Sequence, residues 1–97
     1  MIDACYCWEV FSRAFHALAT GKGNINERLV EAAKEIFTLN SQQLPEQLQS
    51  EFDQLITDLS IKGDFRHTIA TMRKDKAVSL AERILDMEST LREICYQ

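Results

Sequence analysis

Three cysteines are the residues of this chain best suited to chemistry. Cys5 and Cys7 lie near the start of the sequence, and Cys95 lies near its end. Three thiols that converge can bind a metal ion or exchange between thiol and disulfide. A thiol-based redox or metal sensor using Cys5, Cys7 and Cys95 is therefore one interpretation of the sequence.

Two considerations favour the other interpretation, in which the thiols are free and buried. Structural zinc takes four ligands, and His16 follows Cys7 by nine residues, roughly 13 Å along a helix. Free cysteine packs as a small apolar side chain, and an odd number of cysteines fits a reducing compartment better than a disulfide framework. The sequence thus predicts no metal site and no cofactor.

Histidines and glycines give weaker indications. His16 and His67 would lie near one end of a helical bundle with Asp64, but no pair of ligands at helical spacing accompanies them. The turn from Gly21 to Asn24 opens a helix, yet it lacks the strand and the glycine spacing of a phosphate-binding loop. Since no nucleophile or base has an orienting partner, we predict that the protein is not an enzyme.

Basic residues are concentrated in one segment. The stretch 62–76 carries a net charge of +3, although the whole chain carries -4. Such a patch could receive an acidic helix, a phosphate group or an RNA backbone, or it could be a solvated loop. The acidic chain and the lack of interleaved aromatic residues disfavour nucleic acid. The patch consists of Lys62, Arg66, Arg73, Lys74 and Lys76.

The elements that position these residues are predicted to be helices. In the last helix, which starts near Asp75 and ends close to Gln97, apolar residues recur at alternating spacings of three and four. Either the chain's own core or a homodimer can cover this seam, and we add its neighbours Leu85 and Arg92 to the candidate partner-binding surface. The seam consists of Ala77, Leu80, Ile84, Met87, Leu91 and Ile94.

Three further helices are predicted over 2–19, 25–39 and from Pro45 to the break at 62–64, with a short helix within 65–73. Gly21 is expected to end the first helix in a left-handed conformation. Asn24 and Glu27 have the spacing of a capping box, and Asp75 is expected to cap the last helix.

These elements predict an all-α fold: an antiparallel four-helix bundle, up-down-up-down, with room for a short extra helix between the third and fourth. One domain spans 1–97. The apolar stretch 1–20 is interrupted by Asp3, Glu9 and Arg13 and has no basic start, so we predict no membrane association and a cytoplasmic location.

Four short segments stand out in the second half of the chain: 44–48 (LPEQL), 51–52 (EF), 69–72 (IATM) and 81–85 (AERIL). Through these segments the chain resembles a family of short uncharacterised bacterial proteins with no assigned function. The resemblance implies a bacterial origin and an all-helical fold, and no activity accompanies it. Together with the surplus of apolar helix surface, the sequence favours a non-catalytic protein-interaction or regulatory module of unknown pathway.

Overall fold

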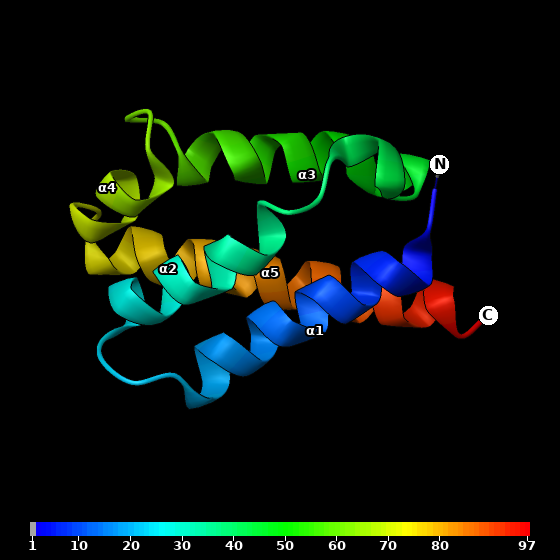
Figure 1. Cartoon of the computed structure of the whole chain (residues 1–97), viewed down its shortest axis with the longest axis horizontal. Coiled ribbons are helices and arrows are strands. Elements are labelled where there is room, and N and C mark those ends of the chain that lie inside the picture. Colours follow the sequence, from blue (N-terminus) through cyan, green and yellow to red (C-terminus); the bar gives the residue numbers. More distant parts are fainter. Residues whose placement is uncertain (1) are drawn as a thin grey trace.

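The computed structural model describes residues 2–97, and within that range every regular element is a helix (Figure 1). The all-α fold class is therefore confirmed, and so is the short helix before the last long one. In chain order the elements are α1 (Ala4–Thr20), α2 (Ile25–Ile36), the 3-10 helix η1 (Ser41–Gln43), α3 (Glu46–Leu59), α4 (Phe65–Ala70) and α5 (Lys74–Cys95).

The long helices α1 and α5 form the centre of the arrangement. They lie side by side, and the two ends of the chain come together at one end of the molecule (Figure 1). Helix α2 packs on α1 and on α4, whereas α3 contacts η1, α5 and α4. The short α4 and its flanking turns occupy the end of the molecule opposite the termini (Figure 1).

One continuous core joins the helices. Helix α1 contributes Val10, Phe11 and Ala14 to it, and the ring of Phe11 meets that of Phe52 from α3 edge to face at 6.4 Å between centroids. The predicted seam of α5 points inward, since all its members except Ile94 are buried and Ile94 packs against the core. The chain's own core thus absorbs this seam.

Helix ends agree with the sequence in part. The capping box of Asn24 and Glu27 is confirmed, because the Asn24 side chain accepts from the Glu27 amide at 2.9 Å and the Glu27 carboxylate accepts from the Asn24 amide at 3.3 Å. Asp64 caps α4 by accepting from the Arg66 amide at 3.2 Å.

Two predicted caps are wrong. Gly21 is extended, with φ of -65°, and it is Gly23 that adopts positive φ (92°), so the left-handed residue comes two residues later than expected. Helix α5 begins at Lys74 with Arg73 at the N-cap position, which leaves Asp75 inside the first turn. A carboxylate there still favours the positive end of the helix dipole, so Asp75 stabilises the helix start without capping it.

No helix within residues 2–97 combines the length and the apolar character that crossing a bilayer requires.

Candidate functional site

Part of the basic segment encloses a hollow of about 400 Å³ at the junction of α3, α4 and α5. Its apolar surface comes from Met72 and from Ile61, whose side chain is 71% exposed. Lys62, Arg73 and Lys76 supply the positive charge. We call this feature the basic hollow; its lining residues are Asp58, Ile61, Lys62, Thr68, Thr71, Met72, Arg73 and Lys76.

Two threonines of the α4 region orient Lys62. The buried Thr68 hydroxyl accepts from the Lys62 amide at 3.0 Å and donates to the Asp64 carbonyl at 3.0 Å. The Lys62 ammonium donates to the Thr71 hydroxyl at 3.1 Å. The turn after α3 is therefore pinned to α4, and the Lys62 ammonium is held beside the hollow.

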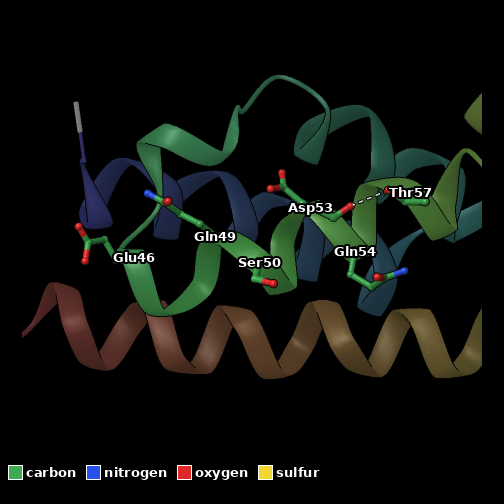
Figure 2. Close-up of a pocket in the computed structure, with 6 residues that line it drawn as sticks. All are labelled: Glu46, Gln49, Ser50, Asp53, Gln54 and Thr57. Carbon is green, nitrogen blue, oxygen red and sulfur yellow. Dashed lines mark hydrogen bonds between the residues drawn. The ribbon is translucent and has the colours of Figure 1, made fainter.

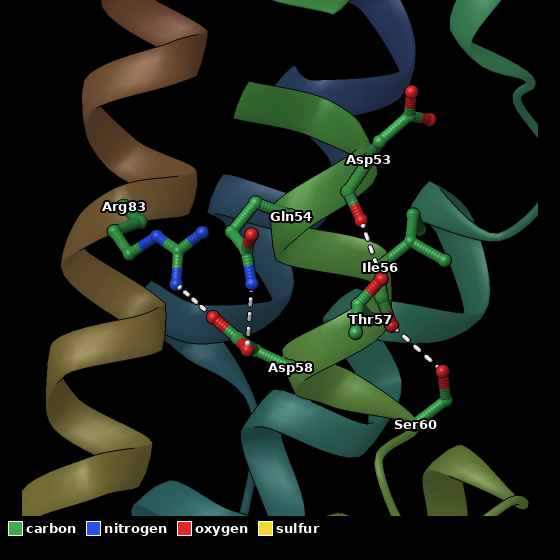
Figure 3. A network of polar contacts seen from close by, with 7 residues as sticks. All are labelled: Asp53, Gln54, Ile56, Thr57, Asp58, Ser60 and Arg83. Carbon is green, nitrogen blue, oxygen red and sulfur yellow. Dashed lines mark hydrogen bonds and ion pairs between the residues drawn. The ribbon is translucent and has the colours of Figure 1, made fainter. Parts of the chain in front are cut away.

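The one carboxylate in the lining, Asp58, is paired with a cation from α5. The Arg83 guanidinium donates to Asp58 at 2.7 Å, and the Gln54 amide donates to the same carboxylate at 3.2 Å (Figure 3). The hydrogen bond from Arg83 is the main cause that lowers the pKa of Asp58 below its usual value. Since Arg83 neutralises Asp58, the charge presented by the hollow comes from its three basic side chains.

An asparagine from α2 positions the backbone on one side of the basic hollow. The Asn26 side-chain amide donates to the carbonyls of Ile69 and Met72, both at 2.9 Å. The Ile69 carbonyl also accepts from the Met72 amide at 3.2 Å, whereas the Met72 carbonyl lies after the end of α4, where no helical turn follows to pair it. Asn26 thereby fixes the backbone that carries Met72 into the hollow, a role that the sequence analysis did not identify.

The other members of the predicted partner-binding surface lie outside the basic hollow. The Arg66 guanidinium lies 5.2 Å from the ring centroid of Phe65, which stacks on Phe37. Lys74 is exposed in the first turn of α5. Arg92 lies near the C-terminal end of the same helix, 3.9 Å from Glu88. The predicted surface is therefore divided between the two ends of α5.

Leu85 lies in a second depression, of about 250 Å³, between α1, the start of α2 and α5. Phe15 and Val78 line it with side chains that are 41% and 38% exposed. We call it the outer groove; its lining residues are Phe15, Leu18, Ala19, Ile25, Val78, Ala81, Glu82 and Leu85.

The cysteines are arranged differently from the expectation of three free thiols. Cys5 and Cys95 form a disulfide that joins the start of α1 to the end of α5, with 4.8 Å between their Cα atoms. Cys7 alone is free and buried, and its thiol donates to the Gln43 carbonyl at 3.3 Å. Burial, reinforced by the Asp3 carboxylate, raises the pKa of the Cys7 thiol to about 11. An unreactive, buried thiol was the correct prediction for Cys7 and the wrong one for Cys5 and Cys95.

The side chains around the disulfide form a compact group. The Trp8 indole donates to the buried carboxylate of Glu88 at 2.8 Å, and its ring meets that of Tyr96 edge to face at 5.7 Å. This group packs the last turn of α5 onto α1 beside the disulfide.

Two further candidate sites gain no support. His16 and His67 are both exposed, and residues 2–97 contain no cluster of three His, Cys, Asp or Glu side chains placed to hold a metal ion. A shallow depression of about 490 Å³ follows the outer side of α3, but its six polar side chains are spread along the helix and do not converge (Figure 2).

Comparisons of the chain with protein-family models, with curated protein sequences and with solved structures find no match.

Proposed function

We propose that this protein is a small, non-catalytic protein-interaction module whose basic hollow receives an acidic amphipathic helix of a partner protein. The observation that carries the proposal is the meeting of Ile61 and Met72 with three cations around one depression, of which Arg73 makes an exposed ion pair of 3.6 Å with Asp75. A partner side chain such as Leu or Phe would fill the apolar part, and flanking carboxylates would pair with Lys62, Arg73 and Lys76.

Burial and charge both support a protein partner over a nucleic acid. Ile61 is too exposed to serve the core, and an apolar contact of this kind gains free energy when a partner covers it. A phosphate backbone would meet the cations but would leave Ile61 and Met72 uncovered. We further propose that the helices form an up-down-up-down bundle, that the chain is related to the bacterial family it resembles, and that the protein is cytoplasmic.

A peptide-display selection against the folded protein tests the proposal. Selected peptides are expected to carry acidic residues around one large apolar residue. In fluorescence anisotropy, Lys62→Glu combined with Arg73→Glu is expected to weaken their binding roughly tenfold or more, because like charges then face each other. The control, Lys22→Glu with Lys34→Glu, makes the same change in net charge on α2 and the turn before it, and should bind as the wild type does. Equal binding by both double variants would contradict the proposal.

A thiol-based redox sensor is the second candidate function, and the bond between Cys5 and Cys95 is the observation that favours it. Reduction would transfer two electrons and two protons to the pair from a dithiol, which would itself become a disulfide. In a reducing compartment such a bond persists only transiently, which is typical of redox sensing. Alkylation of the protein directly in cells would test this role: cycling between reduced and oxidised Cys5 and Cys95 supports a sensor, and a permanently oxidised pair contradicts it.

A further inference from the structure

The side of the α1–α5 pair that carries the outer groove is an apolar strip longer than the groove itself. From α5 the strip takes Val78 and Leu85, and it ends at Tyr96, the residue after the helix, which is 72% exposed. On α1 it includes Phe15 and, two turns earlier, Trp8, whose ring meets that of Tyr96. The strip therefore runs for about 27 Å from Val78 to Tyr96, along most of α5.

Charged residues on this strip are placed symmetrically about its middle. Glu82 lines the outer groove and is exposed, and Arg92 lies ten residues further along α5 on the same side. The point midway between them is also midway between Leu85 and Ser89, and midway between Val78 and Tyr96. Five positions of α5 and its C-cap residue Tyr96 thus form three pairs around a single level.

From this symmetry we infer that the strip is a homodimer interface, in which a second copy of the chain packs α5 against α5 antiparallel. The twofold axis of this dimer lies in the interface plane, perpendicular to α5, at the level midway between Leu85 and Ser89. It places Glu82 of each copy opposite Arg92 of the other copy, so the dimer contains two such pairs. The same axis places the apolar Val78 opposite Tyr96 of the second copy. The chain is therefore complementary to itself in charge and in apolar character along this face.

Arg92 can contact Glu82 of the second copy although it already has a partner within its own chain. Its guanidinium is 3.9 Å from the Glu88 carboxylate, which already accepts a 2.8 Å hydrogen bond from Trp8. The Arg92 side chain is 54% exposed and can extend toward a second copy without leaving Glu88 unsatisfied.

The available area and the residues at the centre agree with a dimer. A standard interface takes about 800 Å² from each partner, roughly a seventh of the 5663 Å² that this chain exposes. A face two helices wide and as long as α5 offers area of that order. Near the twofold level the strip carries the small, half-exposed side chains of Ser12 and Ser89, which allow the helices to approach closely.

Sedimentation equilibrium across a wide concentration series, under oxidising conditions, tests the inference. The wild type is expected to show a monomer–dimer equilibrium. Glu82→Arg alone and Arg92→Glu alone are each expected to weaken self-association roughly tenfold, because each creates two like-charge contacts. An equimolar mixture of the two variants is expected to recover the dimer, since every Arg then faces a Glu.

The control Glu51→Arg makes the same change of charge as Glu82→Arg, but on the exposed side of α3, and should leave the dimer unchanged. A wild type that stays monomeric at every concentration would overturn the inference, as would a mixture that associates no better than its components. Circular dichroism of each variant verifies folding, so a failure to associate is assigned to the interface. None of these variants alters the basic hollow, so the result is independent of the partner-binding proposal.

Discussion

Breaking the bond between Cys5 and Cys95 should remove a large part of the protein's stability. The two residues are separated by 90 positions, so the bond closes a loop of almost the whole chain. In the chain-entropy treatment, closing a loop of that length in the unfolded state stabilises the native state by about 4.5 kcal/mol at 25 °C. For a domain of this size, that free energy corresponds to a fall of about 20 °C in Tm on reduction.

Urea denaturation with and without a phosphine reductant measures the effect. Trp8 is the single tryptophan and lies beside the disulfide, so its fluorescence reports the end of the molecule where the bond is, and circular dichroism reports the helices. Thiol titration in denaturant verifies each state, because the oxidised chain presents one thiol, Cys7, and the reduced chain presents all three cysteines. We expect the free energy of unfolding to fall by 3 to 5 kcal/mol on reduction, about the range found when native disulfides are removed.

A double variant, Cys5→Ser with Cys95→Ser, is the matched control. It should have the stability of the reduced wild type and should not respond to reductant, since Cys7 remains in its buried site. If reduction of a protein shown to be fully oxidised changed its stability by less than about 1 kcal/mol, the entropic argument for this loop would be refuted.

Three other substitutions test contacts within the fold. Asn26→Ala should destabilise the protein by about 1 to 2 kcal/mol in urea denaturation, because the Met72 carbonyl loses its donor and the Ile69 carbonyl keeps only the Met72 amide. Asp58→Asn should lower the free energy of unfolding by about 1 kcal/mol at neutral pH. The pKa of Asp58 is lowered in the folded state, so its ion pair with Arg83 contributes above the unfolded pKa of about 3.9 and is lost as pH falls through the folded pKa. The denaturation curves of variant and wild type should therefore converge in acid. Gly21→Ala should lower Tm by several degrees, about 1 kcal/mol or more, because a Cβ there would press on the Ala17 carbonyl oxygen; an unchanged Tm would show that the turn relaxes without cost.

Features that depend on local periodicity and local hydrogen bonding were predictable from the sequence. The seam of α5 and the capping box at Asn24 follow from spacings within one or two turns of helix. The 3-10 helix η1 has its own capping box of Asn40 and Gln43, which the sequence analysis missed because the segment is too short to show a periodic pattern.

Features that depend on the approach of distant segments were not predictable in the same way. Placing Cys5 and Cys95 at one end follows from antiparallel helices, but a disulfide also requires the two Cα atoms to come within about 7 Å, and no sequence spacing determines that distance. The charge imbalance of 62–76 was visible in the sequence. Neither the exposure of Ile61 nor the reach of Asn26 from α2 to α4 could be deduced from it, because both depend on how the helices pack.

The basic hollow and the disulfide lie at opposite ends of α5, which limits how one can influence the other. Lys76 is in the first turn of the helix and Cys95 is its last residue, so about 30 Å of helix separates them. Between them α5 is buried against the core along its seam, and Arg83 ties it to α3 at Asp58. Loss of the disulfide frees only the last turn beside Trp8, while the hollow depends on Thr68, Thr71 and Asn26 at the other end. Peptide binding at the hollow should therefore be unchanged by reduction at temperatures where the reduced protein is folded, so the interaction and redox proposals can be tested separately.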